Sequence, residues 1–416
     1  MKGVLVILDG LGDLPNRQFG DKTVLEVAHT PNLDFLANRG DMGMMHSVKP
    51  GFTPASDDAI VSIFGNKLMS ATRGMLEAHG TGLKIIRGDL AYRVNFATID
   101  NLKDGNVLDR RVGRTLTDNE AKILANELNN KIKLPVKFEF IPTIQHRATL
   151  VFKGGFSDNV SGNDSTYLLG KHVPIDKVGR CYPLLEDENA IYSANVVNEF
   201  LEHAYEILDK NNVNSERKRK GLLPANYLLL RGPGVEIPKL KQYKKWMSIS
   251  YMPLEIGFSK LSGMETFSFP YPPLKRLDAY ENLHEGLNMA SEFSIKVLKK
   301  HYEDFDYAYI HIKETDLPGH DNKPFEKKAM IEYLDKNLFK FLKEFALSKS
   351  VKICVTGDHS TPCRLKAHSD DPVPVLFYNP SSKLNREIKF CEKNAIRGNL
   401  GTFNGGDLFK VIGFDR

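Results

Sequence analysis

Three short apolar runs in this chain are each followed closely by an acidic residue, and no other feature of the sequence constrains the fold as strongly. The runs are Val4–Leu8, Tyr307–Ile312 and Val351–Val355, and the acids that follow them are Asp9, Asp316 and Asp358. Continuous apolar runs rich in β-branched residues are typical of strands that are buried on both faces of a parallel sheet. In open α/β sheets the functional side chains lie outside the carboxyl ends of the strands. We therefore expect the three acids to meet at one edge of a buried sheet.

The segments around these runs indicate an α/β fold. Residues 326–343 carry apolar side chains at helical spacing, and residues 372–378 have the pattern of a further strand. An alternation of strands and helices is typical of a mostly parallel sheet that is flanked by helices.

The middle of the chain follows a different pattern. Thr117 and Glu120 form a capping box before one helical stretch, and strand-like pieces separate it from a second one. We predict that residues 79–235 form a smaller α+β domain, inserted into a sheet domain that is formed by residues 1–78 and 236–416.

The composition is that of an ordinary globular protein. The 416 residues carry a formal net charge of +5, with 41% hydrophobic and 26% charged residues, which excludes a disordered chain and a dedicated polyanion binder. The basic run at residues 216–220 is therefore interpreted as a solvated loop. No apolar run approaches the roughly 18 residues that span a bilayer, and the four cysteines are widely spaced, as expected of plain thiols in a reducing compartment. We expect a cytoplasmic protein that binds neither nucleic acid nor a membrane.

Carboxylates and imidazoles gather in the segments that follow the strands. They are Asp9, Asp316, His320, Asp358, His359 and His368. These residue types are the ligands of transition-metal sites, and six of them are enough for two ions. Taken one at a time, the acids could instead cap helices and the histidines could be polar surface residues. Because three acids follow three strands, we favour metal binding.

Ser56 lies where a Pro- and Gly-containing segment gives way to a helical pattern. A serine at such a junction is ordinarily an N-cap, and the local composition alone favours this interpretation. The alternative is a nucleophile at a helix N-terminus. There, a metal ion lowers the pKa of the hydroxyl group and the backbone N–H groups attract a phosphate.

Several motifs are similar to those of one enzyme family. They are residues 7–13, 30–34, 55–57, 95–98, 109–114, 230–232, 356–368 and 371–375. On these motifs, which run in order over nearly the whole chain, the sequence resembles the archaeal-type, cofactor-independent phosphoglycerate mutases of the alkaline phosphatase superfamily.

The resemblance implies an alkaline-phosphatase-like fold with a two-metal site. One ion would be held by Asp9, Ser56, Asp358 and His359, and the second by Asp316, His320 and His368. Ser56 would be the nucleophile that takes the phosphoryl group of 3-phosphoglycerate and returns it to the other hydroxyl group of the same glycerate. Carboxylate-rich ligation suits manganese or magnesium, and the histidines also suit zinc or cobalt. No bisphosphoglycerate is expected as a cofactor.

The resemblance also implies that the inserted domain holds the glycerate and keeps water away from the phosphoserine. The expected substrate-binding residues are Arg93, Arg147, Arg231 and Asn163. Arginine is the natural clamp for a small anion, because its fork of N–H groups matches a carboxylate or a phosphate. His146 is the expected proton carrier between the glycerate hydroxyl groups, although a structural histidine fits the same pattern, and Asp164 is the second candidate for that role.

One segment departs from the family pattern. A lysine is expected before Gly257, where it could reach the phosphoryl group, and this chain has Ile256. Lys260 or Lys313 could supply the missing charge, and residues 265–280 also differ from the family. The sequence therefore leaves open a metal-dependent phosphomonoesterase, or a mutase for another phosphorylated acid. A metal-stabilised scaffold without activity is a third interpretation. The sequence does not indicate the oligomeric state.

Overall fold

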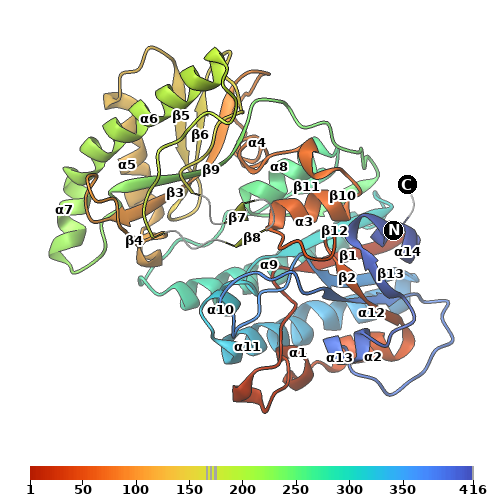
Figure 1. The fold of residues 1–416 in the computed structure, drawn as a ribbon. Coiled ribbons are helices and arrows are strands. Elements are labelled where there is room, and N and C mark those ends of the chain that lie inside the picture. The colour runs from red at the N-terminus through yellow and green to blue at the C-terminus, as the bar shows by residue number, and fades with distance from the viewer. Residues whose placement is uncertain (165–166, 169–170, 173–175, 415–416) are drawn as a thin grey trace.

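The computed structural model describes residues 1–164, 167–168, 171–172 and 176–414, and it has two lobes, each built on its own sheet (Figure 1). The larger sheet has eight strands in the order β11-β10-β12-β1-β13-β14-β2-β15. Their bounds are β1 Gly3–Leu8, β2 Asp41–His46, β10 Trp246–Ile249, β11 Glu265–Phe267, β12 Tyr307–Ile312, β13 Lys352–Gly357, β14 Val373–Tyr378 and β15 Gly401–Asn404. Only β14 runs antiparallel to its neighbours in this sheet. The predicted mostly parallel sheet is therefore confirmed.

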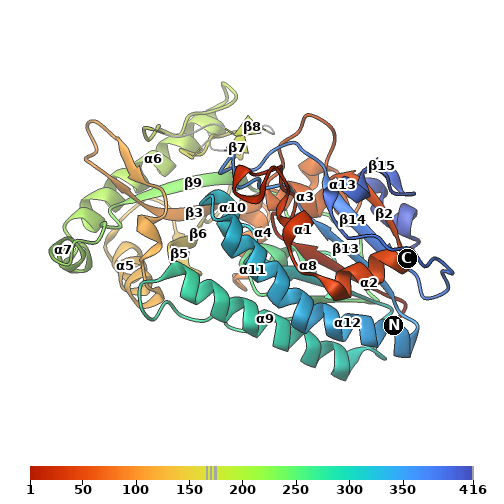
Figure 2. The ribbon, with the colours of Figure 1, turned by 90° about the horizontal axis from the view of Figure 1, so that it is seen from below.

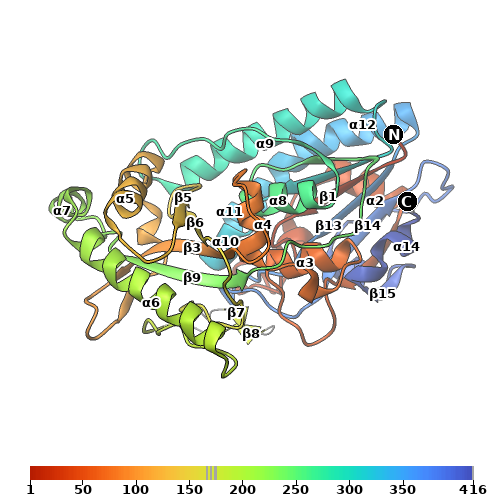
Figure 3. The same ribbon diagram turned by 90° about the horizontal axis from the view of Figure 1, so that it is seen from above.

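Helices cover both faces of the large sheet, which is why its strands β1, β12 and β14 are buried at every residue. In β1, Val4, Val6 and Leu8 pack into one core, whereas Leu5 and Ile7 pack into another. The first core is closed by α1 Val24–Val27, α2 Pro31–Arg39, α9 Ala279–His301, α11 Pro324–Leu334, α12 Lys340–Lys349 and α13 Glu392–Ala395 (Figure 2). The second core is closed by α3 Ser56–Ile63, α8 Pro253–Leu261 and α14 Leu408–Ile412 (Figure 3). Among the helices of the described ranges, none combines the length and the apolarity needed to cross a bilayer.

The smaller lobe is built on an antiparallel sheet. Strand β3 Leu90–Ile99 pairs with β4 Val107–Asp109, β6 Arg147–Phe152 and β9 Tyr227–Gly234, and β6 pairs with β5 Phe138–Pro142. Helices α5 Asp118–Lys131 and α6 Glu188–Asp209 pack against it, and β7 Tyr167–Leu168 pairs with β8 Lys171–His172. The capping box of Thr117 and Glu120 is present at the start of α5. All of these strands lie between residues 90 and 234, and the exact domain boundaries at 78/79 and 235/236 remain our proposal.

Helix α4 Arg73–Gly80 lies between the two lobes and contacts both. A Cβ atom on Gly257 of α8 would lie 1.8 Å from the carbonyl oxygen of Leu76, and one on Gly80 would lie 1.8 Å from that of Pro253. A Cβ atom on Gly74 would likewise lie 2.3 Å from the carbonyl oxygen of Ala91 in β3. The backbones therefore approach each other at distances that only glycine permits, and α4 is fixed to the sheet domain and to the smaller lobe.

Two sequence predictions need correction. Residues 326–343 do not form one regular helix, because a π-helical turn at Asp335–Phe339 separates α11 from α12. The carboxylate of Asp335 accepts hydrogen bonds from the backbone N–H groups of Asn32 and Leu33 at the start of α2.

The basic run at residues 216–220 is mostly exposed, as predicted, but it is not a loop, because it lies at the end of helix α7 Asn212–Arg219. Arg217 is buried there and pairs with Glu120 at 2.9 Å. The charge of that arginine is neutralised inside the smaller lobe rather than by solvent.

Candidate functional site

The three acid-tipped strands are neighbours in the large sheet, in the order β12-β1-β13. Leu8, the last residue of β1, is in register with Ile312 of β12 and with Gly357 of β13. All three strands are parallel, so their carboxyl ends meet at one edge, as predicted. The side chains that follow them form two clusters there.

The first cluster contains Asp9, Asp358 and His359, whose candidate ligand atoms all lie within 4.8 Å of one another. The His359 Nε2 atom is 3.1 Å from Asp9 Oδ1 and 3.4 Å from Asp358 Oδ2. Burial lowers the pKa of His359, but the charges of Asp358 and Asp9 outweigh it and raise the pKa to about 9. Apart from ion pairs with His359 and His311, the buried atoms Asp9 Oδ1 and Asp358 Oδ2 accept no hydrogen bond from any described residue. A divalent cation would satisfy both oxygen atoms.

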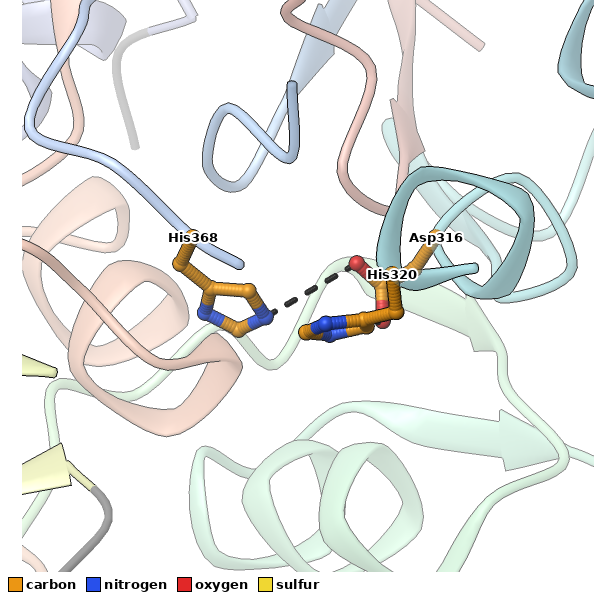
Figure 4. A group of neighbouring side chains, drawn as sticks. All are labelled: Asp316, His320 and His368. Atoms are coloured by element: carbon orange, nitrogen blue, oxygen red, sulfur yellow. Dashed lines mark ion pairs between the residues drawn. The ribbon is translucent and has the colours of Figure 1, made fainter. Parts of the chain in front are cut away.

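The second cluster contains Asp316, His320 and His368 (Figure 4). Asp316 and His320 are four residues apart at the short helix α10 Leu317–His320, and His368 comes from the loop after β13. The His320 Nε2 atom is 3.3 Å from Asp316 Oδ2, and the His368 Nε2 atom is 3.7 Å from Asp316 Oδ1. Neither acid caps a helix through its side chain, since Asp316 precedes α10 without a side-chain cap bond and Asp358 accepts from the N–H groups of Gly10 and His359.

Both histidines of the second cluster present the same ring nitrogen to Asp316. The Nδ1 atom of His320 is 3.2 Å from the carbonyl oxygen of Lys366, and the Nδ1 atom of His368 is 2.9 Å from that of Pro54. A carbonyl oxygen only accepts hydrogen bonds, so each Nδ1 carries a proton, and in the neutral imidazole the lone pair is on Nε2. Such orientation by an outer partner is typical of metal-binding histidines.

Ser56 is the first residue of α3, and Ala55 is the N-cap. The N-cap interpretation of Ser56 is therefore wrong. The backbone N–H of Ala55 donates a hydrogen bond to Asp58 Oδ2 at 3.0 Å. This leaves the Ser56 hydroxyl group available at the helix N-terminus, 3.4 Å from His359 Nε2 and 3.4 Å from Lys313 Nζ.

Lys313 is the lysine that lies at this site, whereas Lys260 is exposed on α8. The Lys313 ammonium group pairs with Asp9 and, at 2.8 Å, with Glu255. Burial lowers the pKa of Lys313, but Asp9 and Glu255 outweigh it and raise the pKa above its usual value. The side chain therefore remains a cation beside Ser56, while Ile256 is half-buried on α8.

A pocket between the lobes is lined by arginines from the smaller lobe and by both clusters. Its basic and imidazole side chains from the smaller lobe are Arg93, Arg110, Arg111, His146, Arg147 and Arg231. Burial, and then the charges of neighbouring arginines, lower the pKa of Arg93 and of His146 well below their usual values. The same causes lower the pKa of Arg111 to about 10. This concentration of positive charge favours a small anion, and Arg93, Arg147, Arg231 and His146 all lie on the wall of this pocket.

Comparisons with known proteins agree with this geometry. A family model for 2,3-bisphosphoglycerate-independent phosphoglycerate mutase matches residues 37–214, and a Metalloenzyme superfamily model matches residues 280–411. The 2,3-bisphosphoglycerate-independent phosphoglycerate mutase of Thermococcus kodakarensis is 38% identical over 419 residues, which cover 99% of this chain and 96% of that protein. The chain belongs to this mutase family.

Solved structures give the same result for the fold. A protein from Pyrococcus horikoshii matches with a TM-score of 0.74 at 28% identity, covering 100% of this chain and 98% of that one. The cofactor-independent phosphoglycerate mutase from Thermoplasma acidophilum matches with a TM-score of 0.58 at 28% identity, covering 100% and 99% of the two chains. The predicted fold class is confirmed.

Two residues that the resemblance to the mutases implies lie behind the arginine pocket rather than on its wall. The Asn163 amide group bonds the backbone of β9, accepting from Leu230 N at 2.6 Å and donating to Leu228 O at 3.0 Å. Asp164 is buried, and its carboxylate accepts hydrogen bonds from Arg110 at 2.8 and 2.9 Å. In this structure Asn163 holds β9, and Asp164 orients an arginine.

Sequence inspection missed three residues of the site. Arg73 of α4 lines the pocket and bonds Asp57 and Glu77, at 2.9 and 2.8 Å. Glu255 holds Lys313, and Thr361 lies between the two clusters. Only the position of Thr361 within the motif at residues 356–368 could have indicated its role, because the other two come from helices with unremarkable patterns.

Proposed function

We propose that this chain interconverts 3-phosphoglycerate and 2-phosphoglycerate without added 2,3-bisphosphoglycerate, as an isomerase of carbohydrate breakdown and synthesis. The observation that carries the proposal is the position of Ser56. Its hydroxyl group lies at a helix N-terminus, beside the first cluster and Lys313, in a pocket lined by arginines. A phosphoryl group entering this pocket meets a nucleophile and compensating positive charge together.

Two divalent ions fit the donor set. Asp9, Ser56, Asp358 and His359 would hold one ion, and Asp316, His320 and His368 would hold the other. The unbonded carboxylate oxygens in the first cluster and the Nε2 lone pairs in the second support this assignment. Manganese or magnesium suits the carboxylates, and zinc or cobalt also suits the histidines. When bound, the ions neutralise charge on the transferring phosphoryl group and lower the pKa of the serine hydroxyl group.

The side chains of the pocket carry out the phosphoryl transfer and bind the substrate. Ser56 Oγ, as an alkoxide, forms a bond to phosphorus as the bond to the substrate oxygen breaks, which gives a phosphoserine and leaves that glycerate oxygen as an alkoxide. A proton then passes to this oxygen from the second glycerate hydroxyl group. The second oxygen attacks the same phosphorus and releases Ser56 as an alkoxide. Arg93, Arg147 and Arg231 hold the carboxylate and the phosphoryl oxygens.

His146 is the proposed carrier of a proton between the two glycerate hydroxyl groups. It lines the pocket, its Nδ1 has no hydrogen-bond partner among the described residues, and its lowered pKa keeps the ring neutral. A neutral imidazole can accept a proton and return it. Asp164 remains the second candidate for this role, and its pairing with Arg110 favours a supporting one.

We further propose that the smaller lobe excludes water from the phosphoserine and that the enzyme works in the cytoplasm. The four cysteines are all buried and free, as expected of a protein from a reducing compartment. No nucleic-acid or membrane partner is proposed.

A second candidate function is the hydrolysis or rearrangement of another phosphorylated acid. The pocket continues into a second chamber, lined in part by Tyr271, Ile144 and Leu283. Tyr271 belongs to residues 265–280, the segment that differs from the family pattern. A substrate with an apolar extension would fill this chamber, whereas phosphoglycerate has none.

The role of Ser56 is tested by Ser56→Ala, assayed with 3-phosphoglycerate. We expect turnover to fall on the order of 10⁴-fold or more, because the nucleophile is removed, and we expect the folded state to persist. Wild-type protein quenched during turnover with phosphorus-labelled substrate should carry the label on Ser56. Full turnover by the variant would exclude the phosphoserine route.

A further inference from the structure

Thr361 connects the two clusters through one atom. Its Oγ1 is 2.7 Å from Asp316 Oδ1 in the second cluster and 3.0 Å from His359 Nδ1 in the first. The residue is fully buried, so water does not compete for these bonds. We propose that Thr361 is a positioning residue that joins the two metal half-sites, with one hydroxyl group orienting a ligand of each. The inference rests on the proposed function, because it takes both clusters as metal sites.

The direction of the two hydrogen bonds follows from the chemistry of the three groups. A threonine hydroxyl group has one proton to donate, and a carboxylate only accepts. The proton of Thr361 therefore goes to Asp316, and the Thr361 oxygen must accept from His359. This places a proton on Nδ1 of His359 and leaves Nε2 to face Asp9 and Asp358. Thr361 thus accepts a hydrogen bond from Nδ1 of His359, as carbonyl oxygens do from Nδ1 of His320 and His368.

Two glycines leave the space that the Thr361 side chain occupies. Gly10 has a φ of +64°, and a Cβ atom there would lie 2.6 Å from Thr361 Oγ1 and 2.6 Å from Asp316 Oδ1. A Cβ atom on Gly319 would lie 2.4 Å from the Thr361 carbonyl oxygen. Gly10 follows Asp9 directly, and Gly319 lies three residues after Asp316. Each motif therefore supplies an acid and also a glycine that leaves space for the Thr361 side chain.

The backbone of Thr361 is held independently of its hydroxyl group. Its N–H donates to the carbonyl oxygen of Gly12 at 3.0 Å. The ammonium group of Lys327, which is fully buried, donates to the carbonyl oxygens of Thr361 and Gly12, at 3.1 and 3.3 Å. The hydroxyl group therefore has a fixed position before any ion binds, and removing it should leave the backbone in place.

The shared hydroxyl group has a consequence for binding. An ion that fixes Asp316 also fixes Thr361 and, through it, the ring of His359. Binding at one half-site should therefore favour binding at the other. Outer partners of this kind typically change metal affinity by about 10–100-fold when they are removed.

Thr361→Val removes the hydroxyl group at nearly constant volume, and Thr361→Ser retains it. The matched control is Thr356→Val, because Thr356 is also fully buried and its hydroxyl group bonds the carbonyl oxygen of Pro374 rather than a cluster residue. Metal-free forms of the four proteins would be titrated with manganese by calorimetry and with cobalt by visible absorption. We expect Thr361→Val to bind cobalt about 10–100-fold more weakly with an altered spectrum, and the serine variant and the control to resemble wild type.

Two ions bound by Thr361→Val with wild-type affinity, coupling and spectrum would overturn the inference. If wild type itself does not bind two ions, the proposed function fails instead. Should Thr361→Val not fold, ¹⁵N NMR of histidine-labelled, zinc-loaded wild type still decides the matter. The ring signal that is lost in His359→Gln is expected to show the proton on Nδ1, and a proton on Nε2 would contradict the assignment.

Discussion

Lys313 places a buried positive charge beside the Ser56 hydroxyl group. The expected lysine before Gly257 is Ile256 here, and Lys313, which follows β12, has its Nζ atom 3.4 Å from Ser56 Oγ. Its ammonium group lies against Asp9 and Glu255, two carboxylates that are buried beside it. We therefore propose that Lys313 supplies the charge that was expected from position 256.

Lys313→Met should lower both stability and turnover. The substitution leaves two buried carboxylates without their cation, and breaking a buried pair in this way costs about 3–5 kcal/mol. Removing a charge beside the reacting group typically costs about 10²–10³-fold in turnover. Urea denaturation of the metal-free protein and a steady-state assay would measure the two effects.

The control for this prediction is Lys260→Met, since Lys260 is an exposed lysine of α8. Its effect on the free energy of unfolding should stay within about 0.5 kcal/mol. Equal losses of stability in the two variants would mean that the pairing of Lys313 with Asp9 and Glu255 contributes nothing beyond that of an exposed lysine.

At the scale of secondary-structure elements, the contact between α4 and α8 links the two lobes. Gly257→Ala places a Cβ atom 1.8 Å from the carbonyl oxygen of Leu76, so the helices must separate. We expect a loss of at least about 1–3 kcal/mol in the free energy of unfolding. We also expect a higher KM, because Arg73 of α4 lines the substrate pocket.

Gly179→Ala is the comparison for the helix contact, because a Cβ atom there meets no atom within 4 Å. Thermal denaturation and a substrate titration of both variants would separate the effect of the contact from that of adding a methyl group. A Gly257→Ala protein with wild-type stability and KM would show that α4 and α8 can move apart freely.

The sequence predicted the strands and helices whose positions are indicated by the local residue pattern. Apolar runs that end in acids located β1, β12 and β13, and because the three strands are parallel neighbours their acids had to meet. The capping box at Thr117 located α5. The π-helical turn at Asp335–Phe339 had no local signal, since its carboxylate is used by α2, about 300 residues away in sequence.

The same distinction applies to the site. The candidate metal ligands were proposed because carboxylates and imidazoles gather in the segments that follow three strands. Arg73, Glu255 and the hydroxyl group of Thr361 were not, because each depends on contacts between segments that are far apart in the chain. The interpretation of Ser56 as an N-cap was wrong because α3 begins at Ser56, with Ala55 as its N-cap.

At the scale of the whole molecule, a buried carboxyl group should make stability depend on pH. Glu392 of α13 accepts from Asp13 N at 3.1 Å and from the Thr23 hydroxyl group at 2.5 Å, and it joins three distant segments. Burial raises the pKa of Glu392 from its ordinary 4.5 to about 7. Between these values the folded state keeps a proton that the unfolded chain has lost.

This contribution to stability is therefore complete below about pH 4.5 and is lost as the pH rises through about 7. It amounts to about 3 kcal/mol. Glu392→Gln cannot titrate, so the free energy of unfolding of wild type should fall relative to that of the variant between about pH 5 and about pH 8. Urea denaturation at both pH values measures the difference. Parallel curves for the two proteins would show that Glu392 has an ordinary pKa in the folded state.

The central claim is that the phosphoryl group taken by Ser56 is returned to glycerate rather than to water. A phosphorus NMR time course tests it directly, with purified protein, manganese and 3-phosphoglycerate, and with no bisphosphoglycerate added. We predict that the 2-phosphoglycerate resonance grows to equilibrium with little inorganic phosphate. Steady growth of inorganic phosphate without 2-phosphoglycerate would contradict the account, and would mean that the same serine and metal ligands serve a hydrolase.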